Sequence, residues 1–226
     1  MVYNLIYRKR RSIGIRVEPP GEVTVFAPQG ISPEAVTAKV RSKAGWIRRQ
    51  LQIMGDAAAW CGEKKCVDGE KYLLLGEVFS LRVVEDERYK TPAVRTAGGQ
   101  LAVMTARADR SSVYGTLHRW YLREADKILR ERAEKYQSLL PVRPAAVIVK
   151  DQRRRWGSCA ADGTLRFNWR LIMAPQSVID YVVVHELCHL VEKKHGKAFW
   201  ELVGSIMPEY REHRRWLREN GLKLSF

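Results

Sequence analysis

Three histidines and one glutamate in the last fifth of the chain are spaced for metal chemistry. Residues 185–189 read His-Glu-Leu-Cys-His, and His195 follows six residues later. On a helix, His185 and His189 lie one turn apart on the same face, where two imidazoles can bind one metal ion. Glu186 lies beside them, in a position to act on water activated by the metal rather than to bind the metal itself. The residue types and their spacing therefore predict a zinc (Zn²⁺) site that activates water.

The third ligand decides what kind of site this is, because three protein ligands leave a position open for water whereas four close it. His195 is the preferred third ligand, since the spacing His185-x3-His189-x5-His195 is that of the metzincin pattern. Three of the five histidines fall within these eleven residues, which argues against a chance arrangement. Glu201 and Glu209 are the alternatives, because a glutamate from the next helix completes thermolysin-type sites.

The helix that carries the two histidines is expected to be buried and to end just before His195. Residues 178–184 are strongly apolar, so imidazole and carboxylate groups on this helix are costly unless they are paired or bound to metal. Glu192 stands where the metzincin pattern has a glycine, so the tight turn of that pattern is not assured. Cations in the last turn and Gly196 just beyond predict a helix end near Lys194, with His195 returning toward the metal.

A basic turn upstream of this helix supplies candidate substrate-binding residues. Residues 153–155 are three arginines, followed by an aromatic residue and a glycine, and such a turn can bind phosphate or carboxylate groups. The strand that follows is expected to extend this surface, and an aromatic hydroxyl after Pro208 is placed to steady a developing oxyanion. An alternative is that the tryptophan and the tyrosine of this set only fill the core. The predicted substrate-binding residues are Arg155, Trp156, Asn168, Arg170 and Tyr210.

Composition and charge limit the class of protein. At 226 residues, the chain is one large domain or two small ones. Lys and Arg number 40 against 25 Asp and Glu, which gives a net charge of +15. That charge favours anionic partners such as nucleic acid, nucleotides or acidic surfaces, although it is also compatible with a passive basic surface. The sequence shows no apolar run long enough for a membrane span, and no apolar signal-peptide segment precedes the basic residues 8–11. We therefore expect a cytoplasmic protein with no membrane association. The oligomeric state is left open.

We predict an α+β fold in two parts. Residues 1–105 form a β-rich N-terminal region with one or two long helices, and residues 106–226 form a minimal zincin core around the HExxH helix. The elements expected in the first part are a hairpin over 13–27 that turns at Pro19-Pro20-Gly21-Glu22, a helix from about 32 to 54, and short strands over 67–84 and 91–104. Those expected in the second part are a helix over 111–139, strands over 146–149 and 164–173, the metal helix after Ala174-Pro175, and helices over 197–206 and 208–220. The strand around 165–169 is expected to pair with an extended substrate at a sheet edge.

The assembled motifs resemble the YgjP-like metal-dependent hydrolases, a group placed with the zincin metallopeptidases. The HExxH motif is also similar to that of the SprT-like and WLM-type proteases, which act on DNA-associated proteins. The resemblance implies a β-rich N-terminal part, a minimal zincin core, and zinc on His185, His189 and His195. Both peptidase activity and hydrolysis of nucleoside triphosphates have been proposed for this group. The segments that carry the resemblance are residues 12–17, 40–47, 155–159, 167–171, the HExxH helix with His195, and Trp216-Leu217.

The residues and the resemblance together predict a zinc-dependent hydrolase, and first of all a metallopeptidase. In this hypothesis Glu186 takes a proton from water and returns it to the leaving group. One alternative is a nucleoside triphosphate hydrolase that cleaves a pyrophosphate bond at the same metal site, with the arginine cluster holding the triphosphate. Another is a nucleic-acid-associated binding module with a structural zinc, which a fourth protein ligand would indicate. The expected partners are a peptide, protein or nucleotide substrate, with nucleic acid bound through the basic surface.

Overall fold

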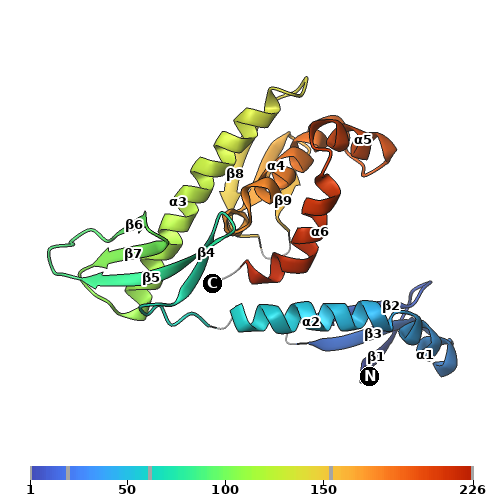
Figure 1. The fold of residues 1–226 in the computed structure, drawn as a ribbon. Helices are drawn as coiled ribbons and strands as arrows, with labels where there is room; N and C mark the ends of the chain where they lie inside the picture. Colours follow the sequence, from blue (N-terminus) through green and yellow to red (C-terminus); the bar gives the residue numbers. More distant parts are fainter. Residues whose placement is uncertain (1, 19–20, 61–62, 153–154, 225–226) are drawn as a thin grey trace. The chain divides into compact units, whose positions relative to one another are not determined.

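The chain forms two compact units, Met1–Gly62 and Glu63–Phe226. A computed structural model describes residues 2–18, 21–60, 63–152 and 155–224, with side chains described outside 56–60 (Figure 1). The predicted turn residues Pro19 and Pro20, and the arginines Arg153 and Arg154 of the basic turn, lie outside the described residues. The boundary between the units lies at residue 62, whereas the sequence pattern placed the division after residue 105.

The first unit is a small sheet covered by two helices. Its strands follow the order β1-β3-β2, in which β2 and β3 form the expected antiparallel hairpin and β1 joins β3 in parallel. The predicted helix over 32–54 is two helices, because the backbone at Lys43 leaves the helical conformation (φ −106°, ψ 6°). The oxygen of Ser32 accepts a hydrogen bond from the backbone N–H of Ala35 at 3.3 Å and so caps the first helix, as its sequence position predicted. The elements are β1 (Asn4–Arg8), β2 (Gly14–Glu18), β3 (Glu22–Pro28), α1 (Pro33–Ser42) and α2 (Ala44–Trp60).

The second unit begins with a four-stranded sheet that packs on a long helix. Apolar side chains of this sheet, Leu81 and Leu101 among them, share one hydrophobic core with Leu117 and Tyr121 of the helix. The hydroxyl of Tyr121 also donates a hydrogen bond to the carbonyl of Leu73 at 2.7 Å. This shared core explains why residues 63–105 belong with the C-terminal elements. In the order β4-β5-β7-β6, the strands are β4 (Lys71–Leu74), β5 (Glu77–Glu85), β6 (Ala93–Ala97) and β7 (Gln100–Thr105), and the helix is α3 (Arg110–Gln137).

A second, smaller sheet lies beside α3 and has the order β8-β10-β9. The strand β10 is therefore central, parallel to β8 and antiparallel to β9. The expectation that the strand around 165–169 pairs with a substrate at a sheet edge is wrong, because both edges of β10 are already paired. The strand is also shorter than predicted, since the oxygen of Asn168 accepts a hydrogen bond from the N–H of Arg170 at 3.1 Å and starts a 3₁₀ helix. The elements are β8 (Ala146–Lys150), β9 (Gly157–Cys159), β10 (Thr164–Asn168) and η1 (Trp169–Met173).

The C-terminal helices complete the second unit and confirm the α+β class. The first of them, α4, is buried along most of its length and packs beside α3 (Figure 1). Its Asp180 is buried, and Arg132 of α3 donates two hydrogen bonds to this carboxylate, at 2.6 and 2.8 Å. Tyr136 adds a third, at 2.9 Å, so the buried charge is paired. The elements are α4 (Gln176–Val191), α5 (Lys197–Ile206), α6 (Tyr210–Asn220) and η2 (Gly221–Lys223). In the described part of the chain, every helix is too short or too polar to span a membrane.

Candidate metal centre

The three predicted histidines converge on one point at the end of α4. The Nε2 atom of His195 lies 3.0 Å from Nε2 of His189 and 3.0 Å from Nε2 of His185. Two of these side chains come from successive turns of α4, and the third comes from the loop between α4 and α5. One nitrogen from each residue can therefore face a single ion. The structure places these residues together as their spacing predicted.

The turn that brings His195 back differs from the sequence expectation. The helix α4 ends at Val191, before the predicted end near Lys194, and Glu192 has an extended backbone (φ −115°, ψ 104°) that does not require glycine. The carbonyl of Glu192 lies 2.9 Å from Nδ1 of His189. Because a carbonyl only accepts hydrogen bonds, this contact places the proton of the imidazole on Nδ1 and leaves the lone pair on Nε2. Gly196 precedes the first turn of α5 rather than ending α4.

The donor set fits a zinc ion. Burial, together with the nearby charges of the other two histidines and Arg214, lowers the pKa of His185 to about 3. Burial also lowers the pKa of His189. Neutral imidazole is the form that binds metal, so this environment favours the binding form of both residues. Three nitrogen donors with no fourth His, Cys, Asp or Glu in the group, among the residues that the structure describes, correspond to an open zinc site.

Two aromatic residues of α5 hold the imidazole rings, and sequence reasoning did not identify them. Phe199 is fully buried, and its ring centroid lies 4.9, 4.4 and 4.8 Å from those of His185, His189 and His195. Trp200 stacks on His195 at 5.6 Å. Phe199 follows His195 by four residues along the chain, and this short separation was the indication in the sequence of a shared contact.

Glu186 is buried next to the histidines and is held against the strand β9. Its carboxylate accepts a hydrogen bond from the backbone N–H of Cys159. A Cβ atom at Gly157 would lie 2.6 Å from Cγ of Glu186, so only glycine leaves room for this carboxylate. Burial raises the pKa of Glu186 to about 7, although the Cys159 hydrogen bond and the charge of Arg155 oppose the rise. A carboxylate with such a pKa is suited to exchange protons near neutral pH.

Two of the predicted substrate-binding residues, Arg155 and Trp156, lie near this centre, and a third, Asn168, holds the backbone of the loop that carries them. Arg155 acts electrostatically on Glu186, and Trp156 lines a pocket beside His185. Asn168 is buried and donates hydrogen bonds to the carbonyls of Gln152 at 2.7 Å and of Arg155 at 3.3 Å. The amide of Asn168 thus holds the loop in front of β9 instead of facing a substrate.

The other two predicted substrate-binding residues do not line the pocket. Arg170 forms an ion pair with Asp151 at 2.6 Å, and its guanidinium lies 4.5 Å from the centre of the Trp169 ring. Tyr210 is largely buried and stacks on Trp200 at 5.3 Å. Tyr210 thus contacts Trp200, which in turn stacks on His195, and Arg170 lies among other side chains.

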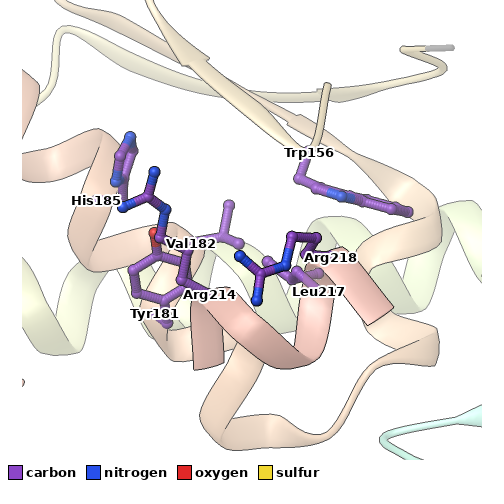
Figure 2. Close-up of a pocket in the computed structure, with 7 residues that line it drawn as sticks. All are labelled: Trp156, Tyr181, Val182, His185, Arg214, Leu217 and Arg218. Carbon is purple, nitrogen blue, oxygen red and sulfur yellow. The ribbon is translucent and has the colours of Figure 1, made fainter. Parts of the chain in front are cut away.

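A pocket of about 290 Å³ opens beside His185, between α4 and α6 (Figure 2). Two arginines of α6, Arg214 and Arg218, line it together with Leu217. Neither arginine was singled out from the sequence, although their i, i+4 spacing around an apolar residue is typical of one helix face that meets a ligand or a neighbour. The side chains drawn along the rest of its wall include Trp156, Tyr181 and His185.

Comparisons with known proteins give one matching family, one relative that matches over part of its length, and one distantly similar structure. A family model described as YgjP-like, metallopeptidase domain, matches residues 11–220. The UTP pyrophosphatase of Escherichia coli (strain K12) is 42% identical over 53 residues, which are 22% of this chain and 32% of that protein. The match thus spans about a third of the relative. The crystal structure of the metallopeptidase zymogen of Pyrococcus abyssi abylysin shares 19% identity at a TM-score of 0.37, over 40% of this chain and 93% of that one. A likeness of that extent carries no argument about function.

Proposed function

Because the chain belongs to the YgjP-like family of metallopeptidase domains, we propose that it is a metal-dependent hydrolase, which uses zinc held by His185, His189 and His195, with Glu186 as general base. The observation that carries this proposal is the convergence of the three Nε2 atoms at 3.0 Å beside a buried glutamate. Zinc in a site of this kind supplies Lewis acidity, which lowers the pKa of water and polarises the bond to be cleaved.

The surroundings of Glu186 suit it to moving a proton. The backbone N–H of Cys159 orients the carboxylate, and Gly157 lets the side chain lie flat against β9. In the proposed reaction an oxygen of Glu186 accepts a proton from the attacking water and then delivers it to the leaving group. A pKa of about 7 supports both steps, because neither the acid nor the base form is strongly favoured near neutral pH.

A peptide is the substrate class that the description of the family suggests. An extended peptide cannot pair with β10, which is central in its sheet. It would have to use β9, the edge strand that carries Gly157 and Cys159 beside Glu186. Main-chain pairing at this edge would bring a peptide bond close to the proposed base.

A nucleoside triphosphate is a second candidate, and the arginine-lined pocket favours it. Arg214 and Arg218 line the same pocket as His185, so phosphate groups and the metal centre would lie next to each other. The relative named UTP pyrophosphatase supports this candidate over a third of its length. A structural zinc in a nucleic-acid-binding module is less well supported, because no fourth ligand joins the three histidines within the described residues.

The proposal is tested by comparing Glu186→Gln with the wild type and with Glu201→Gln. Glu201 is exposed and pairs with Lys197, so it is a matched control outside the site. Zinc is counted in each purified full-length protein, and hydrolysis is followed on casein-derived peptides and on nucleoside triphosphates. We expect one zinc per chain in all three proteins and a loss of activity by a factor of about 10²–10⁴ in Glu186→Gln alone. Wild-type activity in zinc-loaded Glu186→Gln would refute the role of the base, and a wild type without stoichiometric zinc would refute the metal site.

A further inference from the structure

The sheet of the first unit has one face covered by helices and one face that carries arginines. Successive side chains of a strand point to opposite faces of its sheet. The alternate residues of β3 that share an apolar core with α1 and α2 are Val23, Val25 and Ala27. Phe26 therefore lies on the other face, in register with Ile6 of β1 and Gly14 of β2. We call this second face, which carries Phe26, the open face.

Phe26 is a buried aromatic residue that arginines surround. Only 8% of its surface is exposed, yet it belongs to neither of the two hydrophobic clusters that the described residues form. The guanidinium carbons of Arg8, Arg16 and Arg10 lie 4.7, 5.0 and 6.0 Å from the centre of its ring. Attraction between a cation and the face of an aromatic ring extends to about 6 Å. The ring of Phe26 therefore gathers three positive charges on the open face.

Little negative charge balances these arginines. In the described ranges of the chain, no carboxylate forms an ion pair with Arg8 or Arg10. Arg16 pairs with Glu18 at 3.6 Å, but more than half of each side chain is exposed, so water screens this pair. Glu22 lies at the opposite end of β3 from Arg8. The unit as a whole has ten Lys and Arg against four Asp and Glu, so the open face belongs to a positively charged unit.

We propose that the open face binds single-stranded nucleic acid through Arg8, Arg10 and Arg16. A guanidinium that lies over a ring by one plane leaves its other plane and its N–H groups for a ligand. Unstacked bases pack on guanidinium planes, and phosphate oxygens accept two parallel hydrogen bonds from the same group. A single strand offers both kinds of partner at once. This binding needs neither the metal nor Glu186.

Other occupants match the open face less well. An acidic polypeptide would match its charge, but carboxylate side chains offer no ring to stack on the guanidinium planes. A second copy of the chain would bring two positively charged faces together, and like charges repel. A duplex keeps its bases stacked inside and would use only the charge. The strands β1 and β2 have five residues each, so the face is about 17 Å long and suits a short stretch of nucleotides.

The test compares two double variants of the full-length chain. Arg8→Gln/Arg10→Gln removes two charges from the open face, whereas Arg48→Gln/Arg49→Gln removes two exposed charges from α2, which packs on the opposite face. The probes are labelled single strands of RNA and DNA with one mixed sequence, and binding is followed by fluorescence anisotropy at several salt concentrations. The control variant should bind them nearly as the wild type does.

The open-face variant should bind single strands about tenfold or more weakly than the wild type. A hydrogen bond to a charged group contributes at least that factor. The slope of the logarithm of affinity against the logarithm of salt concentration should also become shallower by about 1.4, because two phosphate contacts are lost. The Tm and the bound zinc of each variant are measured in parallel and should equal those of the wild type.

A third variant separates stacking from charge. Arg8→Lys/Arg10→Lys keeps both charges but removes the planar groups. It should bind single strands about two- to fivefold more weakly than the wild type, as expected for the loss of cation–π stacking at an exposed site. Its affinity for a duplex of the same sequence should stay unchanged. Wild-type affinity of this variant for single strands would overturn the choice of a single strand as the ligand.

Three other results would overturn the assignment. The first is no binding of single strands by the wild type. The second is an equal loss of affinity in the two glutamine variants, which would attribute binding to net charge rather than to the open face. The third is tighter binding of polyglutamate than of either strand, weakened in Arg8→Gln/Arg10→Gln, which would assign the face to an acidic protein. A preference for RNA or DNA that disappears in Arg8→Gln/Arg10→Gln would support the assignment and identify the strand.

Discussion

The contact between Gly157 and Glu186 predicts that one added methyl group will lower the proposed hydrolytic activity without unfolding the protein. In Gly157→Ala the new Cβ would lie 2.6 Å from Cγ and 2.7 Å from Oε1 of Glu186. Ordinary contact begins near 3.4 Å, so the glutamate must move by about 0.8 Å. The backbone of Gly157 is a paired β9 residue outside the left-handed region, so alanine adds no strain of its own. The substitution is therefore expected to act by displacing the carboxylate of Glu186.

A displacement of this size is large for a general base. A misplacement of about 1 Å can lower a rate by about 10²-fold, so we expect kcat to fall by roughly that factor. The movement would also weaken the hydrogen bond from the N–H of Cys159, which orients the carboxylate. Metal affinity should stay close to that of the wild type, because Glu186 is not one of the three converging ligands. Loss of turnover with retained zinc is the expected combination.

The assay measures kcat, KM, bound zinc and Tm for the wild type, Gly157→Ala and Gly115→Ala. Gly115 is a matched control, because a Cβ there would meet only the flexible end of Arg119 at 3.4 Å, and alanine favours its helix. If Gly157→Ala keeps the wild-type kcat with a full complement of zinc, then either β9 does not position Glu186 or Glu186 is not the base. A loss of zinc together with a large fall in Tm would instead show that the substitution disrupts the fold, contrary to the reasoning.

Three further predictions concern the metal centre and the helix that carries it. His195→Ala should lower zinc affinity by more than about 100-fold, because removing only the hydrogen-bond partner of a metal ligand already lowers the affinity by up to about 100-fold. Because His195 is exposed, the Tm of the metal-free protein should not change. Phe199→Ala should reduce the free energy of unfolding by about 3–5 kcal/mol and also weaken zinc binding, since its ring supports all three imidazoles; denaturant melts of the zinc-free protein and zinc titrations check the two effects separately, and unchanged zinc affinity would contradict the supporting role. Arg132→Leu should reduce the free energy of unfolding by about 3–5 kcal/mol, because it leaves the buried Asp180 unpaired; the double variant Arg132→Leu/Asp180→Leu should recover part of this loss in the same measurement.

Local features of this protein followed from its sequence. The spacing of His185 and His189 specifies one face of a helix, because helical geometry depends only on residues within a turn or two. The long helix expected over 111–139 is present as α3, Arg110–Gln137, since its apolar residues recur at helical spacing and two prolines follow it. The helices expected over 197–206 and 208–220 are present as α5 and α6 for the same reason.

Features that depend on neighbours distant in the chain needed the tertiary structure. Periodicity shows which face of an element is apolar but does not show which other element covers it. For that reason the sequence did not place β10 between two partners, and it did not join the sheet of residues 71–105 to α3. Small backbone changes were missed as well, such as the break at Lys43 and the early end of α4 at Val191.

The candidate site combines both kinds of information. By itself the sequence identified the residues that we propose carry the chemistry, because the three histidines and Glu186 have distinctive side chains at a local spacing. Only the tertiary structure decided what surrounds them. Packing brought Gly157 against Glu186, placed Phe199 under the imidazoles, and set two arginines of α6 beside His185. These neighbours lie up to 33 positions apart in the chain. They come together because whole helices and strands bury their apolar faces against one another, and a short sequence motif does not specify that packing.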